Sequence, residues 1–225
     1  MYINTKGIIL REVQYKDTSK ILTILTSDEG KLTVSAHGAH RKTGKLAAAT
    51  GLLVFSEMTL LKKKDRWTMT EARSVEQFLG LRDDLKLLAL ATYFSELTEA
   101  VSDEDSPNTQ LLPLCLNALF ALSEKIKTPE FVKPAFELRL MSISGFEPVL
   151  SSEKTYRTDT YEDGIMELSK SAYDAANYIL NCDAKKIYSF TLSEPTLKEL
   201  SIITEKYLLA HLDRTFKTLD YYHKV

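Results

Sequence analysis

The first third of the chain alternates apolar and polar residues, as β-strands do. In residues 31–37, Leu32, Val34 and Ala36 alternate with polar side chains, so that one face can be buried and the other solvated. Short turns favour antiparallel pairing, and closure into a barrel leaves no long exposed edge. The pattern therefore predicts a small barrel of the oligonucleotide-binding (OB) type. Its five expected strands are residues 5–12, 20–26, 31–37, 52–61 and 67–74.

From residue 81 onward, apolar residues recur at intervals of three or four, which is the period of an amphipathic helix. Helices are expected over residues 81–101, 112–122, 128–144, 168–180 and 193–212, and residues 146–163 are polar and irregular. The predicted fold class is α+β multidomain. An OB-fold barrel in residues 1–80 is followed by an all-α helical domain in residues 81–225.

The charge balance divides the chain in the same place. The net charge is -2, but residues 1–80 carry 13 Lys and Arg against 8 Asp and Glu, a net +5, while residues 81–225 are at -7. Such a split suggests two modules with different partners. No apolar run is long enough to span a membrane, and no secretion leader is visible at the N-terminus. With only Cys115 and Cys182, a reducing cytoplasm fits best, without a membrane partner.

The basic residues of the first module gather at strand ends and in two charged loops, residues 38–45 and 62–66. We interpret them as contacts to nucleic-acid phosphates, with little reading of bases. The alternative is that they are solvated surface. Tyr2, Tyr15, Phe55 and Trp67 are candidates for base stacking, although Phe55 and Trp67 could as easily belong to the barrel core, which is the assignment we favour for Phe55. The candidate nucleic-acid-binding residues are Arg11, Lys20, Lys31, His37, Arg41, Lys42, Lys45, Lys62, Lys63, Lys64 and Arg66.

Signals for catalysis are missing from the sequence. The carboxylates are scattered, His37 and His40 have no zinc-type partners, and glycine-rich phosphate loops and nucleophile elbows are absent. We therefore expect no catalytic residue, no cofactor, no metal site and no small-molecule substrate.

Several short motifs occur in a specific order along the chain. They are TKGIIL at 5–10, GKL at 30–32, GAHRK at 38–42, FLGLRDDL at 78–85, FELRL at 136–140, GFEP at 145–148 and YLLAHL at 207–212. Their order and spacing resemble those of the bacterial recombination mediator RecO family. The resemblance runs nearly end to end and fails only around residues 150–165. Many members carry a four-cysteine zinc motif there, whereas this chain has no cysteine in that segment.

The resemblance implies a DNA repair protein that binds single- and double-stranded DNA and is not an enzyme. It implies annealing of complementary strands coated with single-strand-binding protein, and loading of the recombinase RecA with the partner RecR. The acidic, Phe-ended tail of single-strand-binding protein is a further implied partner. A cytoplasmic protein that joins the nucleoid when active would fit this role.

Two other functions stay open from the residues alone. The first is a protein–protein adaptor whose barrel does not bind DNA, and the second is a metal-dependent nuclease. A gel shift with and without divalent metal separates them: the adaptor leaves the oligonucleotide unbound, and the nuclease degrades it.

Overall fold

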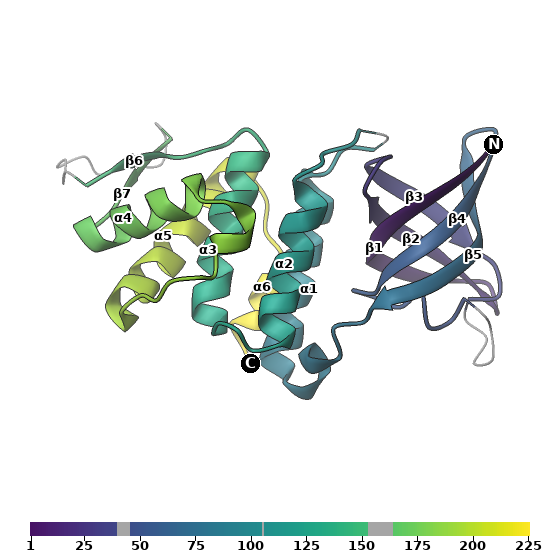
Figure 1. The fold of residues 1–225 in the computed structure, drawn as a ribbon, viewed down its shortest axis with the longest axis horizontal. Helices are drawn as coiled ribbons and strands as arrows, with labels where there is room; N and C mark the ends of the chain where they lie inside the picture. Colours follow the sequence, from purple (N-terminus) through teal and green to yellow (C-terminus); the bar gives the residue numbers. More distant parts are fainter. Residues whose placement is uncertain (40–45, 105, 153–163) are drawn as a thin grey trace. The chain divides into compact units, whose positions relative to one another are not determined.

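A computed structural model describes residues 1–39, 46–104, 106–152 and 164–225, and its first third is a closed five-stranded barrel (Figure 1). The strands follow one another in the order β1-β2-β3-β5-β4, and all neighbours are antiparallel except β3 and β5. This is the OB-type barrel that the sequence predicts. The strands are β1 (Tyr2–Tyr15), β2 (Ser19–Thr26), β3 (Lys31–Ala36), β4 (Phe55–Lys63) and β5 (Arg66–Glu76).

The barrel closes because β1 is long enough to pair with β2 along one edge and with β4 along the other. A register shift between Ile9 and Arg11 inserts an extra residue, which bends the strand. The predicted fourth strand began too early: Leu53 has φ +64° and the Val54 amide donates to the Gly51 carbonyl, so this apolar segment is a buried turn. The barrel core consists chiefly of Ile9, Leu22, Ile24, Leu32, Val34, Met58, Leu60, Trp67 and Met69.

The chain separates into two compact units. The barrel unit comprises Met1–Asp83 and Ala91–Leu112, and the helical unit comprises Asp84–Leu90 and Pro113–Val225. Helix α1 (Leu85–Val101), which follows the short 3-10 helix η1 (Leu79–Asp83), thus contributes to both units. The boundary predicted near Gly80 coincides with the end of the strands, and it stays a prediction as a domain boundary.

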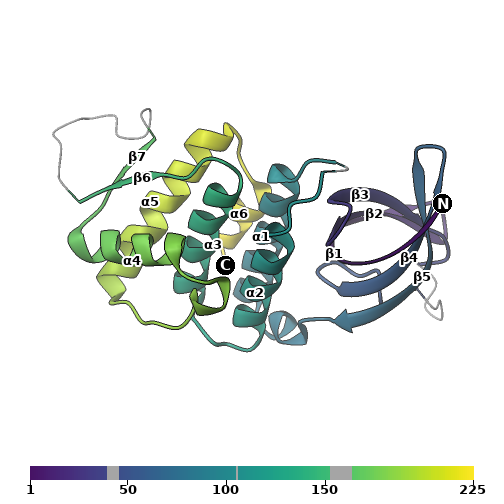
Figure 2. The same ribbon diagram turned by 45° about the horizontal axis from the view of Figure 1, so that its top comes forward.

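The helical unit contains α2 (Leu111–Ser123), α3 (Pro129–Ile143), α4 (Lys170–Asn181), α5 (Glu194–Leu212) and α6 (Lys217–Tyr222), with a short 3-10 helix η2 (Ala184–Lys186). Figure 2 shows α4 and α5 beside α3. Two three-residue strands, β6 (Val149–Ser151) and β7 (Ile165–Glu167), pair in parallel and were not expected from the sequence. Of the cysteines, Cys115 is fully buried and Cys182 is half-buried.

A buried ion network holds α3 to α5. Lys133 is 1% exposed, and its Nζ lies 2.8 Å from Glu137 Oε1 and 2.7 Å from Glu205 Oε2. Thr204 Oγ1 donates to Glu137 Oε2 at 2.7 Å, and His223, after α6, lies 3.1 Å from Glu205. Burial alone would lower the pKa of Lys133, but the two carboxylates outweigh it and raise that pKa.

Within the described part of the chain, no helix is both long and apolar enough to cross a membrane. The same residues contain no group of three His, Cys, Asp or Glu side chains that could share a metal ion.

Candidate nucleic-acid interface

The turn between β4 and β5 carries three exposed cations. Lys63 and Arg66 face each other as the last pair of the hairpin, and Lys64 occupies the turn with φ +53°. No carboxylate of the described residues forms an ion pair with any of the three. They are therefore available to an external anion. We call Lys63, Lys64 and Arg66 the hairpin cations.

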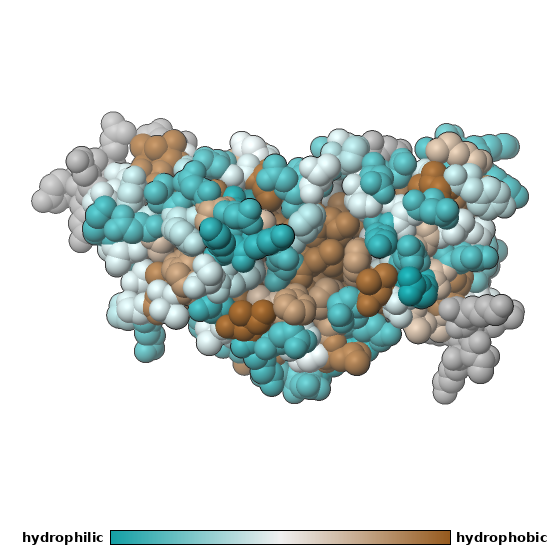
Figure 3. All heavy atoms as spheres, in the orientation of Figure 1, coloured by the Kyte–Doolittle hydropathy of each residue, from teal (hydrophilic) through white to brown (hydrophobic). Residues whose placement is uncertain are grey.

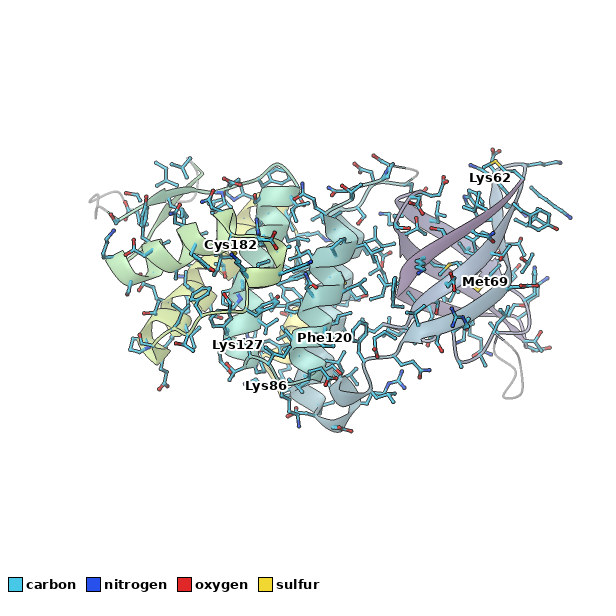
Figure 4. The ribbon with its side chains drawn as sticks, viewed as in Figure 1. Lys62, Met69, Lys86, Phe120, Lys127 and Cys182 are labelled. Atoms are coloured by element: carbon cyan, nitrogen blue, oxygen red, sulfur yellow. The ribbon has the colours of Figure 1, made fainter. Side chains whose placement is uncertain are left out.

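Lys62 differs from its three neighbours. It pairs across the hairpin with Trp67, whose ring points into the barrel, and its Nζ lies 4.9 Å from the centre of that ring. Figure 4 shows Lys62 at the end of the barrel where β4 turns into β5. This cation–π contact gives Lys62 a structural role at the mouth of the barrel.

Three other predicted cations already have partners inside the barrel unit. Arg11 forms an ion pair with Glu99 of α1 at 3.0 Å, and the Lys31 ammonium donates to the Glu99 carbonyl oxygen at 3.0 Å. Lys20 is only 14% exposed at its side chain and lies 2.5 Å from Glu12. A phosphate would have to compete with these contacts, so the structure makes them weaker candidates than the hairpin cations.

The remaining predicted residues belong to the loop after β3. His37 is exposed, with Nδ1 3.3 Å from Ser19 Oγ, whereas Arg41, Lys42 and Lys45 lie outside the described residues. Strand β3 runs parallel to the beginning of β5, so its first residues lie beside the hairpin and His37 follows its far end. Six strand residues span roughly 17 Å. The structure therefore does not bring His37 to the hairpin cations.

The four aromatic candidates differ in how far their side chains are exposed. Trp67 is 6% exposed and belongs to the core, and Phe55 is half-buried. Tyr15 is exposed at the end of β1, beside Lys16. Tyr2 is 66% exposed and pairs with Leu61, close to the hairpin. Of these four rings, Tyr2 is the one that is open and also lies near the hairpin cations.

The helical unit holds a second candidate site, which the sequence did not reveal. An open groove of about 650 Å³ lies between the start of α1, the α2–α3 connection and the start of α5. Leu87, Leu122 and Phe131 give it an apolar floor, and Lys125 and Lys127 stand at its rim. Figure 3 shows hydrophobic surface among hydrophilic residues at the lower ends of α2 and α3. The groove is suited to a ligand with an apolar side chain next to a negatively charged group.

In comparison with known proteins, both parts of the chain match models of one protein family. Residues 1–78 match the family model "Recombination protein O N terminal", and residues 82–220 match "Recombination protein O C terminal". A DNA repair protein RecO of Acetivibrio thermocellus is 31% identical over 98% of this chain and 96% of its own. The RecO of Alkaliphilus metalliredigens is 29% identical over 100% of this chain and 100% of its own. The RecO of Caldicellulosiruptor bescii is 29% identical over 98% of this chain and 97% of its own.

Proposed function

Because this chain belongs to the RecO family of DNA repair and recombination proteins, we propose that it is a non-catalytic, DNA-binding recombination mediator. In this proposal it binds single- and double-stranded DNA, anneals complementary strands, and acts with RecR to load RecA on strands coated with single-strand-binding protein. The barrel would hold the DNA, and the acidic helical part would serve protein partners.

The hairpin cations carry the DNA-binding part of this proposal. The three exposed cations of this turn, which has Asp65 between Lys64 and Arg66, form no ion pair within the described chain, so they remain free for phosphates. Releasing the counterions condensed on DNA supplies most of the affinity of such contacts, independently of base sequence. A protein that anneals strands of any sequence needs this kind of binding.

Replacing Lys63, Lys64 and Arg66 together by Ala should weaken binding to single-stranded DNA and reduce its dependence on salt. Because the variant can no longer neutralise three phosphates, the log–log slope should become less negative by about 2. Fluorescence anisotropy of a labelled oligonucleotide over a range of salt concentrations measures both quantities. Annealing of complementary strands should slow in parallel.

Arg73→Ala is the matched control for the triple variant. Arg73 is also an exposed cation of β5, but it forms an ion pair with Glu57 at 2.7 Å. Its hydrogen bond and its charge lower the pKa of that carboxyl. Its removal should leave the slope unchanged. An unaltered slope in the triple variant would remove the hairpin from the proposal, and wild-type protein without salt-dependent binding would favour the adaptor function.

We further propose that the groove of the helical unit takes the acidic, Phe-ended tail of single-strand-binding protein. A terminal Phe ring would lie on the floor formed by Leu87, Leu122 and Phe131, and its carboxylate would meet Lys125 or Lys127. Lys86 at the same rim is already held by Glu130, at 2.8 Å. The support is the apolar floor together with two lysines at a rim that also carries the Lys86–Glu130 ion pair and Asp84.

The Lys125→Ala/Lys127→Ala variant should bind such a peptide at least about tenfold more weakly, because a charge-assisted contact contributes roughly 1.5–3 kcal/mol. Titration calorimetry with an acidic peptide ending in Phe gives the affinity, and the same peptide with an amidated C-terminus should bind wild type equally weakly. Lys170→Ala is the control, since Lys170 is exposed on α4 and paired with Asp174. Equal peptide affinity in all variants would contradict the assignment.

A further inference from the structure

The chain itself covers part of the barrel face that OB folds commonly use. Thr23 and Leu25 point outward from β2, because Leu22 and Ile24 point into the core, yet both are buried. The segment of α1 within the barrel unit lies over this region: Ser95 Oγ donates to the Leu10 carbonyl at 2.7 Å, and Glu99 holds Arg11. The outer face of β2 at Thr23 and Leu25, part of the usual oligonucleotide surface, is therefore occupied.

On the opposite side of the barrel, the outward-facing residues are exposed or half-buried within the described part of the chain. Ile3, Leu60, Trp67 and Val34 point into the core. Because side chains alternate along a strand, the adjacent residues point outward. The strand register aligns these neighbours in one row across β1, β4, β5 and β3. The members of this outer row are Tyr2, Leu61, Thr68 and Ser35.

The outer row lies next to the hairpin cations on the surface of the barrel. Lys63 follows Leu61 by two residues on β4, and Arg66 precedes Thr68 by two on β5, so both belong to the next outward row. The N-terminal ammonium of Met1 donates to the Lys62 carbonyl, and the Lys62 amide donates to the Met1 carbonyl, which fixes the start of β1 against the hairpin. Figure 1 shows the N-terminus at this end of the barrel. An exposed aromatic ring and the hairpin cations thus share one surface.

We infer that single-stranded nucleic acid binds on this outer β1–β4–β5–β3 face, with a base stacked on Tyr2 and its phosphates on the hairpin cations. The inference rests on the proposed DNA-binding function and specifies its face and mode. Stacking needs an unpaired base, so Tyr2 favours single strands, while the cations hold any strand. Thr68 and Ser35 add hydroxyl donors without selecting a sequence.

Paired oligonucleotides test the role of Tyr2 directly. One is a labelled thymidine strand, and the other is an abasic strand of equal length and phosphate number. Tyr2→Ala should bind the thymidine strand about five- to 150-fold more weakly and the abasic strand as wild type does. Its salt slope should stay that of wild type, since no cation is removed. Tyr2→Phe keeps the ring and should bind normally, and Tyr15→Ala should retain wild-type discrimination.

Because Tyr2 lies at the start of β1, any tag belongs at the C-terminus in this experiment. Unchanged Trp67 fluorescence shows that a Tyr2 variant keeps the barrel folded. Wild-type affinity of Tyr2→Ala for the thymidine strand overturns the inference, as does an equal loss for both strands. In either case, wild-type binding that still depends on salt and on the hairpin cations leaves the proposed function standing. Wild type that binds neither strand overturns both.

Discussion

Lys133→Ala should lower the free energy of unfolding of the helical unit by about 3–5 kcal/mol, because it removes the ammonium that neutralises a buried carboxylate. Glu137 is fully buried, and apart from Lys133 its carboxylate accepts a hydrogen bond from Thr204. Glu205 is partly exposed and keeps His223 as a partner. The expected loss therefore comes mainly from Glu137.

Two probes localise this effect. Trp67 is the only tryptophan and lies in the barrel, so its fluorescence follows the barrel unit, while circular dichroism in the far ultraviolet follows mainly the helices. Urea unfolding of Lys133→Ala should shift the helical transition and leave the Trp67 transition in place. Lys133→Met/Glu137→Gln should recover much of the loss, since Gln still accepts from Thr204 and no ion remains unpaired. A loss below about 1 kcal/mol in Lys133→Ala would contradict the prediction.

The pH dependence of this network has a definite sign. Burial alone would raise the pKa of Glu205, but Lys133 and His223 outweigh it and lower that pKa below the ordinary value. A depressed carboxyl pKa stabilises the fold above the unfolded-state pKa, and this contribution is lost as pH falls through the folded-state value. The Glu205 contribution is thus present in full at neutral pH, where the unfolding experiments belong.

Much of the barrel was predictable because it depends on local alternation. The phase of β3 is visible in Leu32, Val34 and Ala36, and all three are core residues. The prediction that the fourth strand begins at residue 52 was wrong for a physical reason. An apolar run predicts burial, but burial does not distinguish a strand from a buried turn, such as the one with Leu53 at φ +64°. The β6–β7 pair is only three residues long, which is too short to leave a periodic pattern.

The sequence predicts the candidate site as a basic surface of the barrel, but it does not predict the partners of the individual cations. Counting charges identified the barrel as basic. It could not reveal that Arg11 forms an ion pair with Glu99, which lies 88 residues away in the sequence. The same count gave Lys20 and the hairpin cations equal weight, although Lys20 is held by Glu12. The Arg11–Glu99 pair is a property of the tertiary fold, so local sequence carries no signal for it.

Trp67→Ala should destabilise the barrel unit by about 3–5 kcal/mol, and any loss of DNA binding should follow from that. The ring packs in the core and also receives the Lys62 ammonium, so its removal leaves a cavity and a cation without its aromatic contact. Trp67→Ala lacks the fluorophore, so amide hydrogen exchange in β3 and β5 is the appropriate measurement. Exchange there should accelerate by at least about a hundredfold if it proceeds through global opening.

Trp67→Phe separates packing from stacking, because it keeps an aromatic ring of smaller volume in the core. If Trp67 is a core residue, Trp67→Phe should lose less stability than Trp67→Ala and bind single-stranded DNA as wild type does. If the indole instead stacks on a base, this variant should fold normally and bind more weakly. The burial of Trp67 and the exposure of Tyr2 favour the first result. Normal folding with impaired binding in Trp67→Phe would move the stacking site from the outer row to the mouth of the barrel.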